Sequence, residues 1–434
     1  MTFALRDHNQ GEANVGAGPR ERIDRRVLVI GAGIVGLCTS YELAKNGWTV
    51  SLFDPNPPGS QCSSGNAGAL SSGSVAPLAM PGAIKDALTM LVDRNGPLHL
   101  PIHYWLQAAP WLTAFVRSSQ QERVAQIATA LHELLKDSVS SHAELAAEVG
   151  CPELVRRTGQ LHLYPDARAM SKDDASWSLK RKHGLRVEYV DAQAIRALEP
   201  AVSDNYRVGV FLPDEASVTD PLQYGRSIAD ALRARGGEFI TARITSLARS
   251  DDAWHISDGA RTWSGRHVMI SAGAWSGKLL EQLGYKIPLI SQRGYHVQLP
   301  RSGVSLSRIV VLADRKVFIN PMRDGLRIAG TVEIDSIDRP LNKSRALLLK
   351  EHAKAGLRDP ILENESIWMG HRPCLPDSMP VLGAVPNQPN LWCAFGHGHL
   401  GLTGSANTGK LLARALARNS TENEIPMLSI DRFL

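Results

Sequence analysis

The chain has 434 residues, of which 43% are hydrophobic and 21% are charged, and its formal net charge is +5. This composition is typical of a globular protein, and the length is enough for two domains. The small net charge and the lack of a basic stripe with interleaved aromatics argue against a nucleic-acid partner. Five scattered cysteines without C-x-x-C spacing argue against a disulfide framework and a metal site, and favour a cytoplasmic location.

Residues 1–24 are polar and charged, and they predict a flexible arm and not a secretory signal. No run of 18 apolar residues occurs, so we expect no transmembrane helix. The nearest candidate, residues 98–116, is interrupted by Pro101 and Pro110. We expect core-facing helices there, with a membrane-surface patch as the alternative.

The first informative stretch runs from Arg26 to Asp54. Residues 26–30 predict a buried parallel strand, and Gly31-Ala32-Gly33-Ile34-Val35-Gly36 follows as a G-x-G-x-x-G motif that opens a helix. A second strand at residues 48–54 ends in Asp54. The glycines allow a tight turn and a close approach of the backbone to a ligand. The helix N-terminus can bind phosphates, and the acid can accept hydrogen bonds from ribose hydroxyls. Together these features predict a dinucleotide site. The alternative is a glycine-rich turn of an unrelated α/β domain.

Small and polar residues follow the second strand. The run Ser63-Ser64-Gly65-Asn66-Ala67-Gly68 lets backbone and side-chain groups approach a ligand, although a linker would have a similar composition.

The middle of the chain alternates between helical and strand patterns. Asp220-Pro221 is typical of a helix start, with the acid as N-cap and proline in the first turn. We expect helices at 84–149 (clearest at 124–149), 172–183 and 221–235, strands at 161–164, 187–190, 209–214 and 238–247, and a hairpin at 254–263.

The second informative stretch is an apolar strand at 267–274 that ends in Ser271-Ala272-Gly273. Flavoproteins that bind FAD carry a similar strand followed by A-x-G. After it we expect strands at 295–299, 309–312, 317–320, 326–332 and 391–395, and helices at 344–357 and 403–417.

The predicted fold class is α/β plus α+β. A discontinuous, Rossmann-like FAD-binding domain at 25–90, 215–286 and 365–434 would carry an inserted mixed-sheet substrate domain at 91–214 and 287–364.

From residue 25 onwards the chain resembles the D-amino-acid oxidase-like FAD-dependent oxidoreductases, and within them the D-amino-acid dehydrogenase small subunit. The resemblance rests on the G-x-G-x-x-G motif, on Ser64–Gly68 and on several short motifs in the rest of the chain. These motifs are Leu212-Pro213-Asp214 with Asp220-Pro221, Arg293-Gly294-Tyr295, Gly370-His371-Arg372-Pro373 with Pro376-Asp377, Pro380-Val381-Leu382-Gly383 and Gly396-His397-Gly398. The resemblance implies non-covalent FAD and oxidation of the Cα–N bond of an amino acid.

The resemblance also assigns substrate-site residues. Arg372 would bind the substrate carboxylate, with a structural arginine that caps carbonyls before Pro373 as the alternative. Tyr295 would lie near the substrate or in the core. His399 would contact the substrate side chain, which opens D-proline and hydroxy-D-proline as substrates.

The remaining cofactor contacts are expected around the start of the last helix. Its N-terminus would point at the pyrimidine end of the flavin. The residues concerned are Gly396, His397, Gly398, Leu400, Gly401, Leu402 and Thr403. Cys374 would be a packed thiol or, alternatively, a point of covalent flavin attachment.

The implied function is oxidative deamination of D-amino acids to 2-keto acids and ammonia, by hydride transfer from Cα to flavin N5. The electron acceptor would be a quinone or a respiratory-chain component, with at most peripheral association at the inner face of the cell membrane. Alternatives are a (hydroxy-)D-proline dehydrogenase and a glycine or sarcosine-type amine oxidase that uses oxygen. Other classes are an NAD-dependent dehydrogenase and a non-catalytic flavoprotein or complex subunit.

Overall fold

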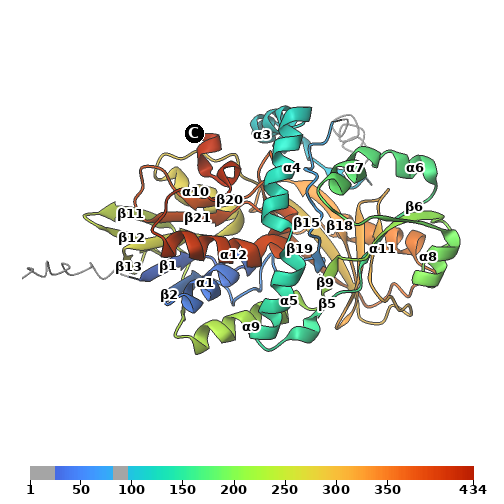
Figure 1. The fold of residues 1–434 in the computed structure, drawn as a ribbon, viewed down its shortest axis with the longest axis horizontal. Helices are drawn as coiled ribbons and strands as arrows, with labels where there is room; N and C mark the ends of the chain where they lie inside the picture. Colours follow the sequence, from blue (N-terminus) through green and yellow to red (C-terminus); the bar gives the residue numbers. More distant parts are fainter. Residues whose placement is uncertain (1–24, 82–95) are drawn as a thin grey trace, which may run out of the picture.

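The computed structural model describes residues 25–81 and 96–434; the predicted arm and the start of the predicted 84–149 helical region lie outside them. Two sheets lie side by side, with the helices α4 (Gln121–Leu135) and α5 (Ser138–Glu148) between them (Figure 1). This arrangement of two sheet-centred regions confirms the predicted fold class.

The smaller sheet has six strands in the order β10-β2-β1-β14-β21-β20. The strands are β1 (Arg26–Ile30), β2 (Thr49–Asp54), β10 (Glu238–Thr241), β14 (His267–Ile270), β20 (Val381–Ala384) and β21 (Leu391–Phe395). All neighbours run parallel except β20 and β21. β1 is central and apolar because both faces of the sheet are covered.

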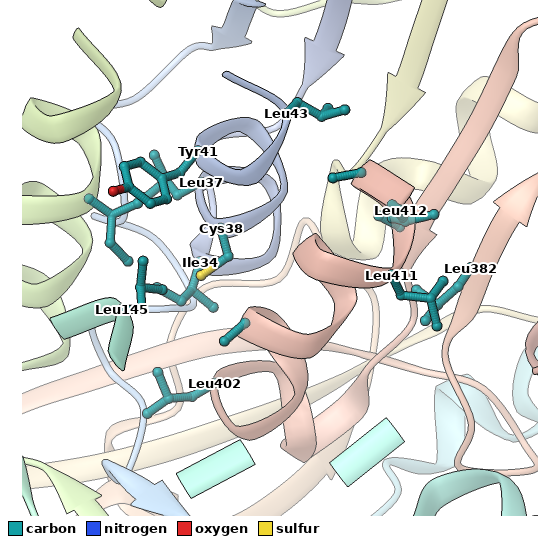
Figure 2. Packing of buried hydrophobic residues seen from close by; sticks show 14 of the residues in the cluster. Ile34, Leu37, Cys38, Tyr41, Leu43, Leu145, Leu382, Leu402, Leu411 and Leu412 are labelled. Carbon is teal, nitrogen blue, oxygen red and sulfur yellow. The ribbon is translucent and has the colours of Figure 1, made fainter. Parts of the chain in front are cut away.

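Two helices that are far apart in the sequence pack against each other beside this sheet: α1 (Ile34–Lys45) and α12 (Gly401–Ala417) (Figure 2). They approach closely because Gly409 has no side chain; a Cβ there would lie 2.7 Å from the Cys38 carbonyl oxygen. α9 (Pro221–Ala234) also packs on α1, and the Asp220 carboxylate caps it by accepting the Gln223 N–H at 2.9 Å.

The larger sheet has nine strands, eight of them in the order β19-β15-β18-β17-β16-β6-β8-β7. These are β6 (Gln160–Tyr164), β7 (Glu188–Asp191), β8 (Val208–Leu212), β15 (Ile290–Leu299), β16 (Ile309–Leu312), β17 (Val317–Met322), β18 (Gly325–Ile334) and β19 (Ser366–Cys374); the ninth, β4 (Leu98–His99), pairs with β18. α11 (Lys343–Gly356) packs on β15 and β18. The sheet is mostly antiparallel, with parallel β6–β16 and β4–β18 pairs, so it is mixed as predicted.

Short elements complete the described chain. Two three-stranded sheets contain β11 (Ser246–Ser250), β12 (Ala253–Ser257) and β13 (Thr262–Gly265), and β3 (Ala69–Leu70), β9 (Ala216–Val218) and β5 (Val155–Arg156). The other helices are α3 (Trp105–Arg117), α6 (Ala167–Ser171), α7 (Asp174–Lys182), α8 (Ala192–Leu198) and α10 (Ser276–Glu281). The 3-10 turns are η1 (Ile102–Tyr104), η2 (Pro152–Leu154), η3 (Gly273–Trp275), η4 (Gly398–Leu400), η5 (Pro426–Leu428) and η6 (Ile430–Phe433).

Some segments that were predicted as one helix or one strand form two separate elements in the structure. The single helix expected at 124–149 is α4 and α5, broken at Lys136-Asp137; its apolar pattern continues across the break because Leu134 and Leu145 belong to the same core. The helix predicted at 172–183 is confirmed as α7, with α6 as a separate helix before it, and the strand predicted at 238–247 is replaced by β10 and β11. α12 begins at Gly401, two residues before the predicted start.

The expectation of core-facing helices at 98–116 holds for only one side of α3. This helix buries Ala108 and Trp111 against the core, whereas Leu106 on its other side and Ile102 on the preceding η1 are each 89% exposed. None of the helices in the described ranges combines the length and apolar content needed to cross a bilayer.

The predicted domain boundaries stay a prediction. Every strand of the smaller sheet falls within 25–90, 215–286 or 365–434, but β19, which begins at Ser366, pairs with β15 in the larger sheet.

Candidate functional site

A cavity of about 1600 Å³ lies between the two sheets. Its wall includes the ends of β1, β2 and β21 on one side and β6, β18 and β19 on the other. Pockets for one small ligand measure roughly 300–1,000 Å³, so this cavity has room for a dinucleotide together with a second small molecule.

The glycine motif forms one end of the cavity. Gly31 has φ +109°, and a Cβ there would lie 2.3 Å from the Ser271 carbonyl oxygen. A Cβ on Gly36 would lie 1.9 Å from the Gly31 carbonyl oxygen, so the first turn of α1 can reach β1 only with glycine at this position. Gly33, Ile34 and Val35 line the cavity, whereas Gly36 lies behind it.

The first turn of α1 has backbone donors available for an anion. The Ile34 N–H donates to the Ser63 hydroxyl at 2.8 Å, so Ser63 acts as a partial cap. Among the described residues, the N–H groups of Val35 and Gly36 have no protein acceptor. Together with the helix dipole, these donors are what a pyrophosphate requires.

Asp54 ends β2 at the cavity wall. Its carboxylate accepts the Ala32 N–H at 2.9 Å and the Asn56 N–H at 2.8 Å. These two bonds fix the side chain and leave further acceptor positions for hydroxyl groups of a ligand.

The segment from Ser63 to Gly68 is held by the larger sheet. The Arg327 guanidinium donates to the carbonyls of Ser64 (2.9 Å) and Asn66 (2.7 Å), and the Asn320 amide donates to the Ala67 carbonyl (2.8 Å). Ser63, Asn66 and Ala67 line the cavity, whereas Ser64 and Gly68 do not. This fixed geometry argues against a linker.

Two further predicted segments reach the cavity. Ala272 and Gly273 follow β14 and line it, and all eight residues from Gly396 to Thr403 line it around the start of α12. The His397 ring packs beneath that helix, with Nε2 3.0 Å from the Thr408 hydroxyl, and burial lowers its pKa to about 3. Two helix N-termini, a glycine cradle and an anchored acid therefore fit FAD.

Arg372 points into the cavity from β19. Its guanidinium lies over Gly294 of β15, where a Cβ would be 2.3 Å from Cζ. Arg372 is half-buried, and within the described part of the chain it has no acid or carbonyl partner. An unpaired guanidinium beside a cofactor cradle is suited to a carboxylate, and the missing carbonyl partner argues against the capping alternative.

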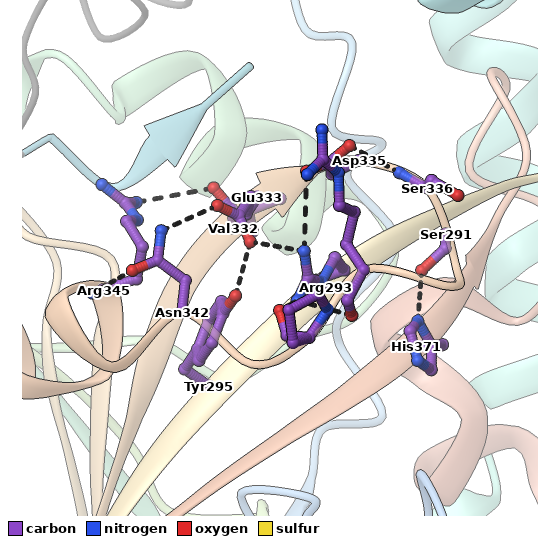
Figure 3. A network of polar contacts seen from close by, with 12 residues as sticks. Ser291, Arg293, Tyr295, Val332, Glu333, Asp335, Ser336, Asn342, Arg345 and His371 are labelled. Carbon is purple, nitrogen blue, oxygen red and sulfur yellow. Dashed lines mark hydrogen bonds and ion pairs between the residues drawn. The ribbon is translucent and has the colours of Figure 1, made fainter. Parts of the chain in front are cut away.

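Tyr295 does not line the cavity. It is buried in the larger sheet, and its hydroxyl donates to the Glu333 carboxylate at 2.5 Å (Figure 3). Glu333 also pairs with Arg293 at 3.0 Å. The expected substrate contact of Tyr295 is therefore corrected to the alternative, a core position, because its hydroxyl serves this buried network.

His399 lies on η4 with its exposed surface toward the cavity. Its pKa is lowered to about 4, mainly by burial within the molecule and further by the charges of Arg372 and Lys180. His399 is therefore neutral at pH 7 and can contact a substrate without competing for its carboxylate.

Cys374 is buried beside Gly398, and burial raises the pKa of its thiol to about 12. Because a thiol of this kind is not a nucleophile at neutral pH, the packed-thiol interpretation fits better than covalent attachment. The described residues contain no group of three histidine, cysteine, aspartate or glutamate side chains placed to hold a metal ion.

Sequence reasoning did not single out several polar residues that line the cavity: Gln160, Lys180, Glu215 and Gln292. Glu215 directly follows the Leu212-Pro213-Asp214 motif, which is the one signal that could have found it. Gln160 begins β6 one residue before the predicted strand.

Comparison with known proteins agrees with this geometry. Residues 26–415 match the family described as FAD dependent oxidoreductase. A D-amino-acid oxidase of Bradyrhizobium diazoefficiens is 36% identical over 420 residues, covering 94% of this chain and 99% of the relative. A D-amino acid dehydrogenase of Paramagnetospirillum magneticum is 31% identical, with the same coverage. Glycine oxidase from Geobacillus kaustophilus superposes with a TM-score of 0.72 at 20% identity, over 94% of this chain and 99% of that one, which shows a shared fold.

Proposed function

The chain belongs to the family of FAD-dependent oxidoreductases, and from this premise we propose that it oxidises D-amino acids to 2-keto acids and ammonia. The observation that carries the proposal is the unpaired Arg372 guanidinium, which lies in the same cavity as the cradle for FAD. The names of the two relatives support D-amino acids as the substrate class.

Arg372 positions the substrate. A planar guanidinium can bind both oxygens of a carboxylate, which fixes the direction of the Cα–H bond. Gly294 allows this position, because any larger residue would occupy the space of the guanidinium.

The chemistry needs little more from the protein. When bound, FAD supplies the two-electron acceptor for the hydride that leaves Cα. The substrate amino group must be neutral before the Cα–N bond becomes an imine, and water then hydrolyses the imine to a 2-keto acid and ammonia. The protein therefore has to orient the substrate, and the bound ammonium group has to lose a proton before the hydride leaves Cα.

A substrate panel tests the proposal. The purified holoenzyme is mixed without oxygen with D-alanine, other D-amino acids, their L-forms, D-proline, hydroxy-D-proline and sarcosine, and the flavin absorbance is recorded. We expect bleaching by D-amino acids. Bleaching by cyclic imino acids alone would move the function to a (hydroxy-)D-proline dehydrogenase, and bleaching by sarcosine or glycine alone to an amine oxidase.

We also propose a quinone or respiratory-chain component as electron acceptor, with peripheral contact to a membrane. Ile102 and Leu106 are exposed on η1 and α3, and Trp105 of the same surface lines the cavity as well. A side chain that is shared by an apolar surface and the cavity wall supports access for an apolar acceptor. Rapid peroxide formation in air, without stimulation by a soluble quinone analogue, would contradict this assignment.

A further inference from the structure

Glu215 is a buried acid in the cavity wall to which the proposed mechanism gives no role. It lies between β8 and β9, and only 1% of its surface is exposed. Its carboxylate accepts the N–H groups of Ser72 (2.7 Å) and Gly73 (2.9 Å) and is 3.4 Å from the Ser72 hydroxyl. A carboxylate offers about four acceptor positions, so these contacts leave room for one more donor from the cavity.

Other buried acids of the described chain, unlike Glu215, form ion pairs with arginine side chains. Glu199 pairs with Arg308 at 2.9 Å, Glu333 with Arg293 at 3.0 Å, and Asp377 with Arg432 at 2.8 Å. Glu215 has no basic group within ion-pair distance among residues 25–81 and 96–434. Lys180 of α7, which also lines the cavity, attracts the carboxylate from beyond ion-pair distance. A buried charge without a contact partner is costly, and a cavity is the place where a ligand can supply one.

Arg372 presents the opposite charge in the same cavity, and among the described residues it has no acid or carbonyl partner. An ionised α-amino acid carries a carboxylate and an ammonium group on one carbon atom. The two unpaired side chains, one cationic and one anionic, are complementary to these two groups.

Glu215 is also fixed relative to the start of α12. The Ser71 N–H donates to the Thr403 hydroxyl at 3.3 Å, and Thr403 donates to the Ala69 carbonyl at 3.2 Å. The next residues along the same segment, Ser72 and Gly73, hold the Glu215 carboxylate. The acid therefore belongs to the side of the cavity where α12 begins.

We propose that Glu215 binds the α-amino group of the substrate and that Arg372 binds its carboxylate. This inference rests on the proposed function and adds a second charged anchor to it. Burial raises the pKa of Glu215 to about 7, while Lys180 of α7 and the two N–H groups act in the other direction. Much of the acid is therefore ionised above neutral pH, as ammonium binding requires.

The test compares two ligands that differ only in the amino group. D-Alanine binding is measured by anaerobic bleaching of the holoenzyme, and propanoate binding by the shift in flavin absorbance. For Glu215→Gln we expect the dissociation constant of D-alanine to rise about tenfold or more, since a hydrogen bond to a charged group is lost, and that of propanoate to change less than about twofold.

Two variants serve as controls. Arg372→Met should weaken the binding of both ligands, because both carry a carboxylate. Glu199→Gln removes a buried acid outside the cavity and should change neither affinity. If Glu215→Gln does not fold, the wild-type enzyme is titrated with 2-aminoisobutyrate, which has no Cα–H bond and is therefore not oxidised. Lowering the pH through 7 should weaken its binding, measured by the shift in flavin absorbance, and not that of propanoate.

Three results would overturn the inference: an unchanged affinity for D-alanine in Glu215→Gln, an equal loss for D-alanine and propanoate, or a loss seen with D-lysine alone, which would assign Glu215 to a side chain. Failure of the proposed function has a separate signature. In that case no D-amino acid would bleach the wild-type flavin, and the inference would fall with it.

Discussion

The two sides of the cavity recognise ligands in different ways. The side formed by β1, β2 and α1 offers backbone N–H groups and glycines whose missing side chains let the backbone come close. The side formed by the larger sheet offers side chains such as Arg372 and Gln292. The cofactor cradle therefore depends on backbone geometry that few substitutions preserve, whereas substrate recognition depends on side chains that can be changed one at a time.

The largest effect is expected in the cradle. In Gly36→Val, the new Cβ would lie 1.9 Å from the Gly31 carbonyl oxygen, so α1 must move away from β1. We expect the purified protein to retain no FAD, as measured by its visible spectrum. Gly277→Ala is the control, because its Cβ would meet Leu289 at 3.7 Å, an ordinary contact; an equal loss of FAD there would show that the effect is not local.

A smaller effect is expected where a glycine supports a substrate side chain. In Gly294→Ala, the new methyl group occupies the space of the Arg372 guanidinium and displaces it without removing its charge. We expect kcat/KM for D-alanine to fall about tenfold or more, equivalent to about 1.4 kcal/mol or more, with FAD retained. Unchanged kinetics would mean that the observed position of Arg372 is not the one used in the reaction.

The pH dependence separates the two charged anchors. Glu215 has its pKa raised to about 7, so it becomes neutral as the pH falls through 7 and loses its attraction for an ammonium group. Affinity for D-alanine should therefore decrease by up to about tenfold between pH 8 and pH 6. A flat profile across this range in the wild type, or an identical slope in Glu215→Gln, would remove this role.

The smallest kinetic effect is expected at Tyr295. Tyr295→Phe removes the bond to Glu333 inside the larger sheet and leaves the cavity wall intact. We expect the free energy of unfolding to drop by about 1–3 kcal/mol and kcat/KM to change less than about twofold. A thermal or denaturant unfolding curve measured beside the kinetics tests both parts, and a large loss of activity without a loss of stability would return Tyr295 to the substrate site.

The same contrast explains what could be predicted from the sequence. Residues 26–54 form a local unit in which strand, turn, helix and acid follow one another, so its spacing alone indicated the fold. The setting of Arg372 depends on pairing between β15 and β19, which lie more than 60 residues apart. β19 was not predicted because it mixes polar residues with Pro373 and lacks a regular apolar pattern.

Other misses have equally local causes. Tyr295 looks the same in sequence whether it faces a ligand or a buried acid, and only the position of Glu333 across the sheet decides. Glu215 is a single acid in a turn, and its burial arises from Ser72 and Gly73, which are more than 140 residues away. Such roles depend on tertiary contacts, which the spacing of apolar residues along the sequence does not predict.

The most direct test of the central claim compares wild-type holoenzyme with Arg372→Met in an anaerobic titration with D-alanine. If Arg372 binds the substrate carboxylate, wild-type flavin bleaches, and the variant, which still carries FAD, requires roughly 100-fold more D-alanine. If both proteins bleach at the same concentration, Arg372 does not hold the substrate and the account of the site is wrong.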